Sequence, residues 1–173
     1  MKISDTQLES ATNSIPEETN AVVVFVKTIN IRVKVVEARQ LQGNNIPPVC
    51  KIICAGSQKE TKVKSQTNSP YWDETFYFNF YEAAATLLEK PIVFGVYHSK
   101  KMRKDALIGS FKFDLGLVYD QDKHALLNKW LLLCDPDDTM SGCKGYLKVS
   151  VVIVGPGDEP PVPTEEPPQA MHE

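Results

Sequence analysis

The stretch that decides the fold is residues 67–78, which read Thr-Asn-Ser-Pro-Tyr-Trp-Asp-Glu-Thr-Phe-Tyr-Phe. Asn68 and Pro70 predict a turn, because both residue types favour turn backbones. Trp72 follows as an aromatic anchor at a strand edge, and the two acids after it offer a carboxylate that can pin the turn. Aromatic side chains then alternate with others, which predicts a strand with one apolar face.

The same period-two alternation recurs through the middle of the chain. Turn residues separate the runs at short spacing, and only 82–89 and 115–121 are predicted to be briefly helical. About eight strands, each with one apolar face, indicate an all-β fold, an eight-stranded antiparallel β-sandwich. The expected strands cover residues 31–35, 49–55, 59–64, 76–81, 92–97, 111–113, 129–134 and 147–151.

Composition divides the 173 residues into three segments. Residues 1–27 predict an N-terminal linker or strand extension, 28–155 the folded domain, and 156–173 a disordered acidic, proline-rich tail. The longest uncharged apolar run, 21–26, is far shorter than the ~20 residues that cross a bilayer, and no secretory signal is expected. Cys50 and Cys54 fall on one face of a strand and are expected in the core, and the four cysteines favour a reducing, cytosolic setting.

The net charge of −3 is unevenly distributed along the chain. Residues 1–24 carry −3 and residues 155–173 carry −5, so the 130 residues between them hold +5. A basic body with acidic ends is compatible with an anionic partner surface. Nucleic acid is not expected, because there is no groove of arginine and stacking aromatics and the acidic ends would repel a polyanion.

Residues 67–78 resemble the C2-domain signature Thr-x-Asn-Pro-x-Trp-Asn/Asp-Glu-x-Phe-x-Phe, with Ser69 as one extra residue. Residues 33–41 resemble the first C2 strand and its loop, and residues 107–112 the strand after the third loop. Residues 129–138, 144–149 and 155–159 resemble the ferlin family, most closely its second C2 domain. The resemblance implies a fragment or short isoform of a large, membrane-anchored protein of vesicle fusion and membrane repair, at the cytoplasmic face of the plasma membrane or of vesicles.

The resemblance also allows the calcium positions of C2 domains to be compared one by one. Calcium prefers several oxygen ligands, and clustered carboxylates set its affinity. Here Asn44 or Asn45 replaces the early aspartate with a neutral amide, Pro47 occupies a ligand position, and His98 and Lys100 replace the aspartates of the third loop. Asp105 alone could supply a carboxylate, amid four cations. We therefore expect no metal site and no cofactor at these degenerate positions.

Two basic clusters are candidate lipid-binding sites. Lys100, Lys101, Met102, Arg103 and Lys104 place one apolar side chain among four cations, and such a tip could touch an anionic bilayer, with Met102 and Ile46 entering the headgroup boundary. Lys62 and Lys64 alternate on the expected strand 59–64, with Lys59 close by and Lys51 on the neighbouring strand. The C2 resemblance implies a phosphoinositide site here, because many C2 domains carry a lysine-rich concave face at this place that binds phosphoinositide headgroups. A solvated loop and ordinary outward-facing lysines remain the alternative interpretations.

A further acidic cluster, Asp135, Asp137 and Asp138, fits either a turn that enters the last hairpin or a separate divalent-cation site.

Three functional hypotheses follow from these features. The leading one is a non-catalytic C2 module that docks to an anionic phospholipid surface or to adjacent ferlin domains without calcium. The alternatives are a protein–protein interaction domain that uses Tyr77 and Tyr81, and a calcium-dependent phospholipid-binding domain. An enzyme with a small-molecule substrate is not expected, because no histidine has a recognisable nucleophile partner and no glycine-rich phosphate loop is present.

Overall fold

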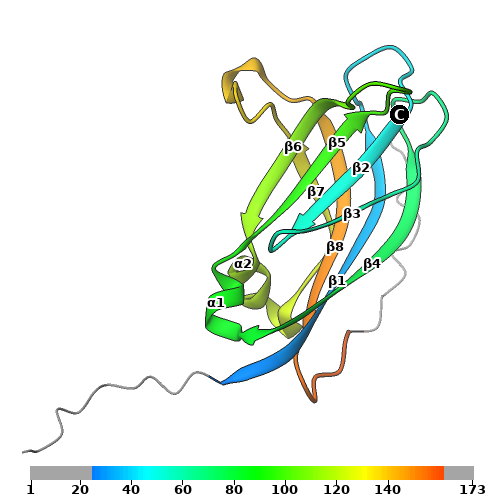
Figure 1. The fold of residues 1–173 in the computed structure, drawn as a ribbon. Coiled ribbons are helices and arrows are strands. Elements are labelled where there is room, and N and C mark those ends of the chain that lie inside the picture. The colour runs from blue at the N-terminus through cyan, green and yellow to red at the C-terminus, as the bar shows by residue number, and fades with distance from the viewer. Residues whose placement is uncertain (1–24, 162–173) are drawn as a thin grey trace, which may run out of the picture.

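Two four-stranded antiparallel sheets face each other in the computed structural model, which describes residues 25–161 (Figure 1). Sheet A has the strand order β4-β1-β8-β7 and sheet B the order β3-β2-β5-β6. The predicted eight-stranded antiparallel β-sandwich is confirmed. The strands are β1 (Val26–Arg39), β2 (Pro48–Cys54), β3 (Ser57–Glu60), β4 (Tyr71–Ala83), β5 (Pro91–His98), β6 (Ala106–Asp114), β7 (Ala125–Leu133) and β8 (Gly145–Val154); the helices are α1 (Ala84–Leu88), α2 (Leu115–Tyr119), η2 (Asp122–His124) and η3 (Thr139–Ser141).

Alternation along the strands builds the core. Ile31, Val33 and Val35 of β1 have no exposed surface, because β1 pairs with β4 on one side and β8 on the other while its inner face packs on sheet B. Cys50 and Cys54 of β2 are fully buried, as expected. Burial raises the pKa of the Cys54 thiol to about 12 and raises that of Cys50 as well, so both are neutral thiols at physiological pH.

The deciding stretch 67–78 behaves as its residue types predict. The carbonyl of Pro70 accepts a hydrogen bond from Ala38 N at 2.9 Å, which joins the turn to β1. Trp72 is buried and its Nε1 donates to the carbonyl of Lys62 at 2.9 Å. The pinning carboxylate is that of Glu74, which accepts from Lys62 N at 3.0 Å. These contacts tie the start of β4 to β1 of sheet A and to the segment that follows β3.

The expected strand 59–64 is wrong in its position, because β3 is Ser57–Glu60. Thr61 N still donates to the carbonyl of Cys50 at 2.9 Å, but the Cys50 amide donates to the Thr61 side-chain Oγ1 at 3.0 Å. A side-chain hydroxyl thus replaces the next backbone partner, and Lys62 turns to the Glu74 carboxylate. The chain leaves sheet B at Thr61 and crosses toward sheet A.

The strand connections are divided between the two ends of the sandwich (Figure 1). Segments 40–47, 61–70, 99–105 and 134–144 lie at one end, whereas α1, α2, η2 and the Ala55–Gly56 turn lie at the other. β1 begins at Val26, inside the segment expected to be a linker or strand extension. The predicted linker over residues 1–24 and the predicted tail beyond residue 161 lie outside the described residues. No helix within residues 25–161 is both long and apolar enough to cross a bilayer.

The edge strands β6 and β7 join the two sheets near the loop end. Ser110 N donates to the carbonyl of Cys134 at 2.8 Å, and Cys134 N donates back at 3.0 Å. Gly109 allows this approach, since a Cβ there would lie 2.8 Å from the Cβ of Lys144 and 3.0 Å from that of Leu133. Both neighbouring atoms are Cβ atoms, which are bonded directly to the backbone, so they can move away only if the backbone shifts.

We predict that Gly109→Ala lowers the free energy of unfolding by about 1–3 kcal/mol, because the added methyl overpacks this junction. Urea unfolding followed by tryptophan fluorescence measures the change. Lys112→Ala, an exposed position on the same strand, is the matched control and should stay within about 0.5 kcal/mol. Equal unfolding free energies for Gly109→Ala and the unchanged chain would contradict this account.

Candidate functional site

Three loop segments meet at the loop end of the sandwich. Ser99 N donates to the carbonyl of Pro47 at 2.9 Å, and Thr67 N donates to the carbonyl of Ile46 at 3.0 Å. The Asn68 side chain bonds the first loop twice, donating to the carbonyl of Gly43 at 2.8 Å and accepting from the backbone N of its neighbour Asn45 at 3.1 Å. These contacts give the tip a defined shape.

The degenerate calcium positions do gather at this tip. Pro47 and Ser99 are hydrogen-bonded neighbours, and His98 ends β5 opposite Pro48 and Ala106. Asn45 is exposed, with a left-handed φ of 43°. Among residues 25–161, no group of three or more His, Cys, Asp or Glu side chains could hold a metal ion.

A fixed cation engages the one carboxylate of the third loop. Lys51 Nζ of β2 lies 2.9 Å from Asp105 Oδ2, while Asp105 Oδ1 accepts from Lys100 N at 3.0 Å. Lys51 Nζ also lies 4.8 Å from the centroid of the Tyr97 ring and 4.0 Å from the Glu60 carboxylate. Both oxygens of Asp105 are thus engaged by groups of the protein itself.

The pKa values of this pair move in the directions that an ion pair requires. The backbone N–H of Lys100 and then the Lys51 ammonium hold the pKa of Asp105 below its ordinary 3.8. The hydrogen bond to Asp105 raises the pKa of Lys51 above its ordinary 10.5, against the opposing effect of burial. The pair therefore stays ionised across the physiological range, and its contribution is lost only as the pH falls below 3.8 or rises above 10.5.

The basic tip residues beyond Ser99 are all exposed. Met102 stands fully in solvent at 104% relative exposure, with a left-handed φ of 61° at the apex of the loop. The other four, Lys100, Lys101, Arg103 and Lys104, surround it with positive charge. The structure therefore brings this predicted cluster together, and the Lys100–Asp105 hydrogen bond closes its base.

Two details of the tip differ from the sequence-based prediction. Ile46 was expected to enter a headgroup layer, but it is buried and lies beside Gly43. Met140 of η3, in the fourth loop, is 92% exposed and was missed, because its position in the hairpin loop gave no periodic signal. Asp135 Oδ1 accepts from Asp137 N at 2.9 Å, and this contact fits the turn interpretation of the acidic cluster.

The second predicted cluster does not share one strand and one face. Lys59 is paired with Ile52 across β2–β3, and its Nζ reaches the carbonyl of Tyr77 and the Phe78 ring on β4. Lys62 and Lys64 lie beyond the end of β3, in the segment that joins the tip. The outer face of sheet B carries instead a hollow of about 160 Å³ lined by Lys51, Ile53, Gln58, Val93, Gly95, Tyr97, Lys104 and Asp105.

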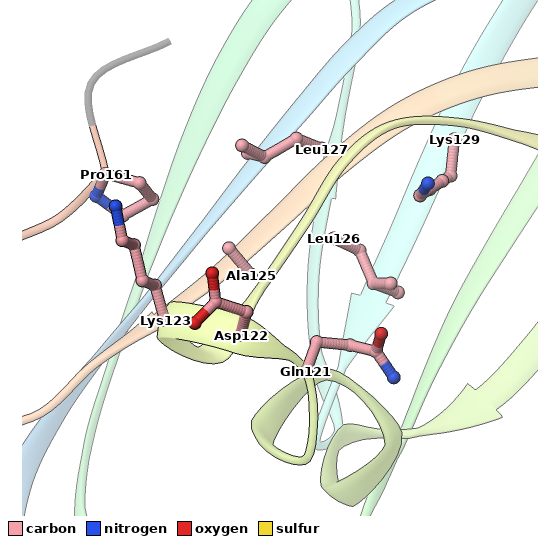
Figure 2. Close-up of a pocket in the computed structure, with 8 residues that line it drawn as sticks. All are labelled: Gln121, Asp122, Lys123, Ala125, Leu126, Leu127, Lys129 and Pro161. Atoms are coloured by element: carbon pink, nitrogen blue, oxygen red, sulfur yellow. The ribbon is translucent and has the colours of Figure 1, made fainter. Parts of the chain in front are cut away.

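A larger groove, of about 480 Å³, lies at the opposite end from the tip (Figure 2). Its apolar floor comes from the start of β7, where the register shifts between Leu126 and Lys129. Asp122 supplies the one carboxylate among the lining residues, and none of these residues is a histidine, cysteine or serine. The groove is lined by Gln121, Asp122, Lys123, Ala125, Leu126, Leu127, Lys129 and Pro161.

Comparison with known proteins agrees with the fold. The C2 domain family matches residues 30–133, and the FerI (NUC094) domain family matches residues 134–173. A C2 domain of plant extended synaptotagmin 1 has a similar structure, with a TM-score of 0.58 at 22% identity over 73% of this chain and 94% of that one. β8 falls within the FerI match, yet it pairs with both β1 and β7 and completes the sandwich.

The sequence is also similar to ferlin proteins. Myoferlin of Xenopus tropicalis is 50% identical over 132 residues, which is 76% of this chain and 7% of that protein. Myoferlin of Homo sapiens is 43% identical over 159 residues, which is 92% of this chain and 8% of that protein. The chain thus spans less than a tenth of the length of these relatives.

We predict that Asp105→Asn speeds hydrogen exchange at the Lys100 amide about fivefold, because the amide loses a charged acceptor and the loop loses its ion pair. Exchange followed by NMR measures the rate residue by residue. Asp114→Asn, which removes an exposed carboxylate at the far end of β6, is the control and should leave that amide unchanged. Unchanged exchange in Asp105→Asn would show that the loop does not depend on the pair.

A pH titration tests the same pair independently. We expect the Asp105 carboxyl, followed by carbon-13 NMR, to titrate below 3.8. In Lys51→Gln the midpoint should rise but stay below 3.8, since the Lys100 N–H is the larger cause of the lowered pKa. A midpoint at or above 3.8 in the unchanged chain would contradict the geometry.

Proposed function

The chain belongs to the C2 domain family, as a ferlin C2 domain, and from this premise we propose that it is a non-catalytic module that docks to anionic membrane without calcium. The docking surface in this proposal is the basic tip, Lys100 to Lys104, supported by Lys62 and Lys64 on the neighbouring segment. The observation that carries the proposal is the contact between Lys51 and Asp105, at 2.9 Å.

This contact supports calcium independence for an electrostatic reason. A calcium site needs several oxygens with negative charge left to share, and the third loop offers one carboxylate. That carboxylate already has an ammonium on one oxygen and a backbone N–H on the other. A calcium ion would have to displace Lys51 and then sit beside the four exposed cations of the tip, whose repulsion opposes it.

The exposed cations support membrane attraction. Each basic residue near an anionic bilayer contributes roughly 1 kcal/mol, and the four at the tip act together because one loop presents them. Met102 stands at the apex between them, where an apolar side chain can enter the headgroup boundary. Lys64 N donates to the carbonyl of Pro48, which holds the neighbouring lysines at the same end of the sandwich.

The non-catalytic part of the proposal rests on the groove beside β7 and on His124. His124 stacks on Tyr119 at 3.8 Å between ring centroids, with its Nδ1 directed at the Tyr119 carbonyl, so it is committed to a structural contact. The groove beside β7 has no nucleophile paired with a base among its lining residues. We further propose, from the resemblance to the ferlin family, a place at the cytoplasmic face of a membrane in a protein of vesicle fusion and membrane repair.

We predict that replacing Lys100, Lys101, Arg103 and Lys104 together by Gln weakens binding to phosphatidylserine vesicles at least tenfold, because the attraction of the tip for the anionic surface is removed. Co-sedimentation at fixed ionic strength measures it. The unchanged chain should bind equally in calcium and in chelator, and less as salt rises.

The matched control neutralises four other cations that lie away from the tip, Lys27, Lys112, Lys123 and Lys129. This variant carries the same net charge, so a generic effect of charge would weaken both variants equally. Binding that requires calcium would overturn the calcium-independent part of the proposal. Failure of the unchanged chain to bind vesicles even at low salt would overturn membrane docking itself.

A further inference from the structure

The outer face of sheet A carries large apolar side chains where a solvent-facing sheet ordinarily carries polar ones. Tyr71 is 58% exposed, Leu132 43%, Trp130 38% and Tyr146 37%. Exposed aromatic residues gathered on one patch are typical of interaction surfaces, and Trp, Tyr and Arg dominate binding hot spots.

The strand registers show that these side chains form two adjacent rows. Tyr71 is opposite Glu37, Glu37 is opposite Lys148, and Lys148 is opposite Trp130, so the first row crosses all four strands. At about 4.8 Å per strand this row spans roughly 14 Å. In the second row, Tyr146 lies between its partners Arg39 and Leu132. We name these seven residues the aromatic face.

Trp130 is held in place by two cations. The guanidinium carbon of Arg39 lies 5.0 Å from its ring centroid, and Lys148 Nζ lies 5.7 Å from it. Arg39 is anchored in turn by the Glu37 carboxylate at 2.7 Å. Side chains fixed before binding lose little entropy on binding, so the aromatic face is preorganised for a partner.

The charge of the aromatic face indicates what that partner carries. Arg39 is 50% exposed, whereas Glu37, its acidic neighbour, is only 18% exposed. A partner therefore meets the Arg39 guanidinium and the rings more than the Glu37 carboxylate. Carboxylates bond well to such cations, and the rings between them offer an apolar contact.

The aromatic face also lies on a different sheet from the basic tip. The tip joins β5 to β6 of sheet B, whereas the aromatic face lies on the outer face of sheet A, where the ends of β1, β4, β7 and β8 reach the same end of the sandwich. We propose that the aromatic face docks an acidic segment of a protein that carries an apolar side chain between its carboxylates. This proposal does not depend on membrane docking by the tip.

The test selects a phage-displayed library of random peptides against the immobilised chain. We expect enriched peptides with Asp or Glu flanking an apolar residue, and at least tenfold weaker binding of those peptides to Trp130→Ala and to the double variant Arg39→Gln, Lys148→Gln. The double variant keeps polar side chains of similar reach, so it separates lost charge from lost packing; urea unfolding checks that it stays folded. Lys112→Gln, on the outer face of sheet B, is the matched control and should bind as the unchanged chain does.

The outcomes that overturn the proposal are specific. If the selection enriches no acidic peptides, the aromatic face is not the docking site proposed. The same conclusion follows if the enriched peptides bind the variants and the unchanged chain equally. The same variants are also pelleted with phosphatidylserine vesicles, where we expect binding within twofold of the unchanged chain. Loss of vesicle binding in these variants would make the face a membrane surface and overturn the proposal, whereas failure of the tip variants alone would leave it standing.

Discussion

The rest of the structure depends on β1, which is hydrogen-bonded along both edges and buried along one face. It pairs with β4 on one side and β8 on the other, and its inward Ile31, Val33 and Val35 have no exposed surface. Every later strand reverses direction against a neighbour, so the connections alternate between the two ends of the sandwich. The segments after β1, β3, β5 and β7 therefore share one end, and polar and charged residues that are far apart in the sequence lie close together there.

At that end the chain places a tethered cation beside the third loop. Lys51 belongs to β2, a strand fixed on both edges by β3 and β5, so its ammonium reaches Asp105 from a rigid base. A tethered cation is present at constant stoichiometry, whereas a metal ion comes and goes with its concentration. On the proposed function, attraction to a membrane would then depend on ionic strength and lipid charge, and a rise in calcium concentration would not change it.

The sequence predicted what depends on local pattern and missed what depends on register. Alternation in β1, β4, β5 and β8 predicted both the strands and the sandwich, because each strand has one face to bury. The end of β3 was missed, because the Thr61 hydroxyl replaces a backbone hydrogen-bond partner there. No pattern in the neighbouring residues predicts that replacement. The gathering of exposed cations at the tip was predictable, since a run of four cations around Met102 cannot be buried. The pairing of Lys51 with Asp105 was not, because residues so far apart meet only once the register of β2 on β5 is known. The aromatic face was missed for the same reason, since Trp130 and Arg39 come from different strands.

The two proposed surfaces, the basic tip and the aromatic face, would both attract negative charge, and this sets a condition on how one domain can use them together. An acidic partner on the aromatic face lowers the positive potential that the tip projects toward a membrane, so simultaneous binding is opposed by electrostatics. The opposition falls with distance over a Debye length of about 8 Å at physiological salt. The ends of β1, β4, β7 and β8 carry the aromatic face at the same end of the sandwich as the tip, so screening by salt decides how strongly one bound partner opposes the other. On the two proposals, the surfaces would compete most at low salt, and added salt would weaken the competition. On the two proposals, a domain with this charge arrangement would bridge a membrane and an acidic protein segment only where salt screens one partner from the other.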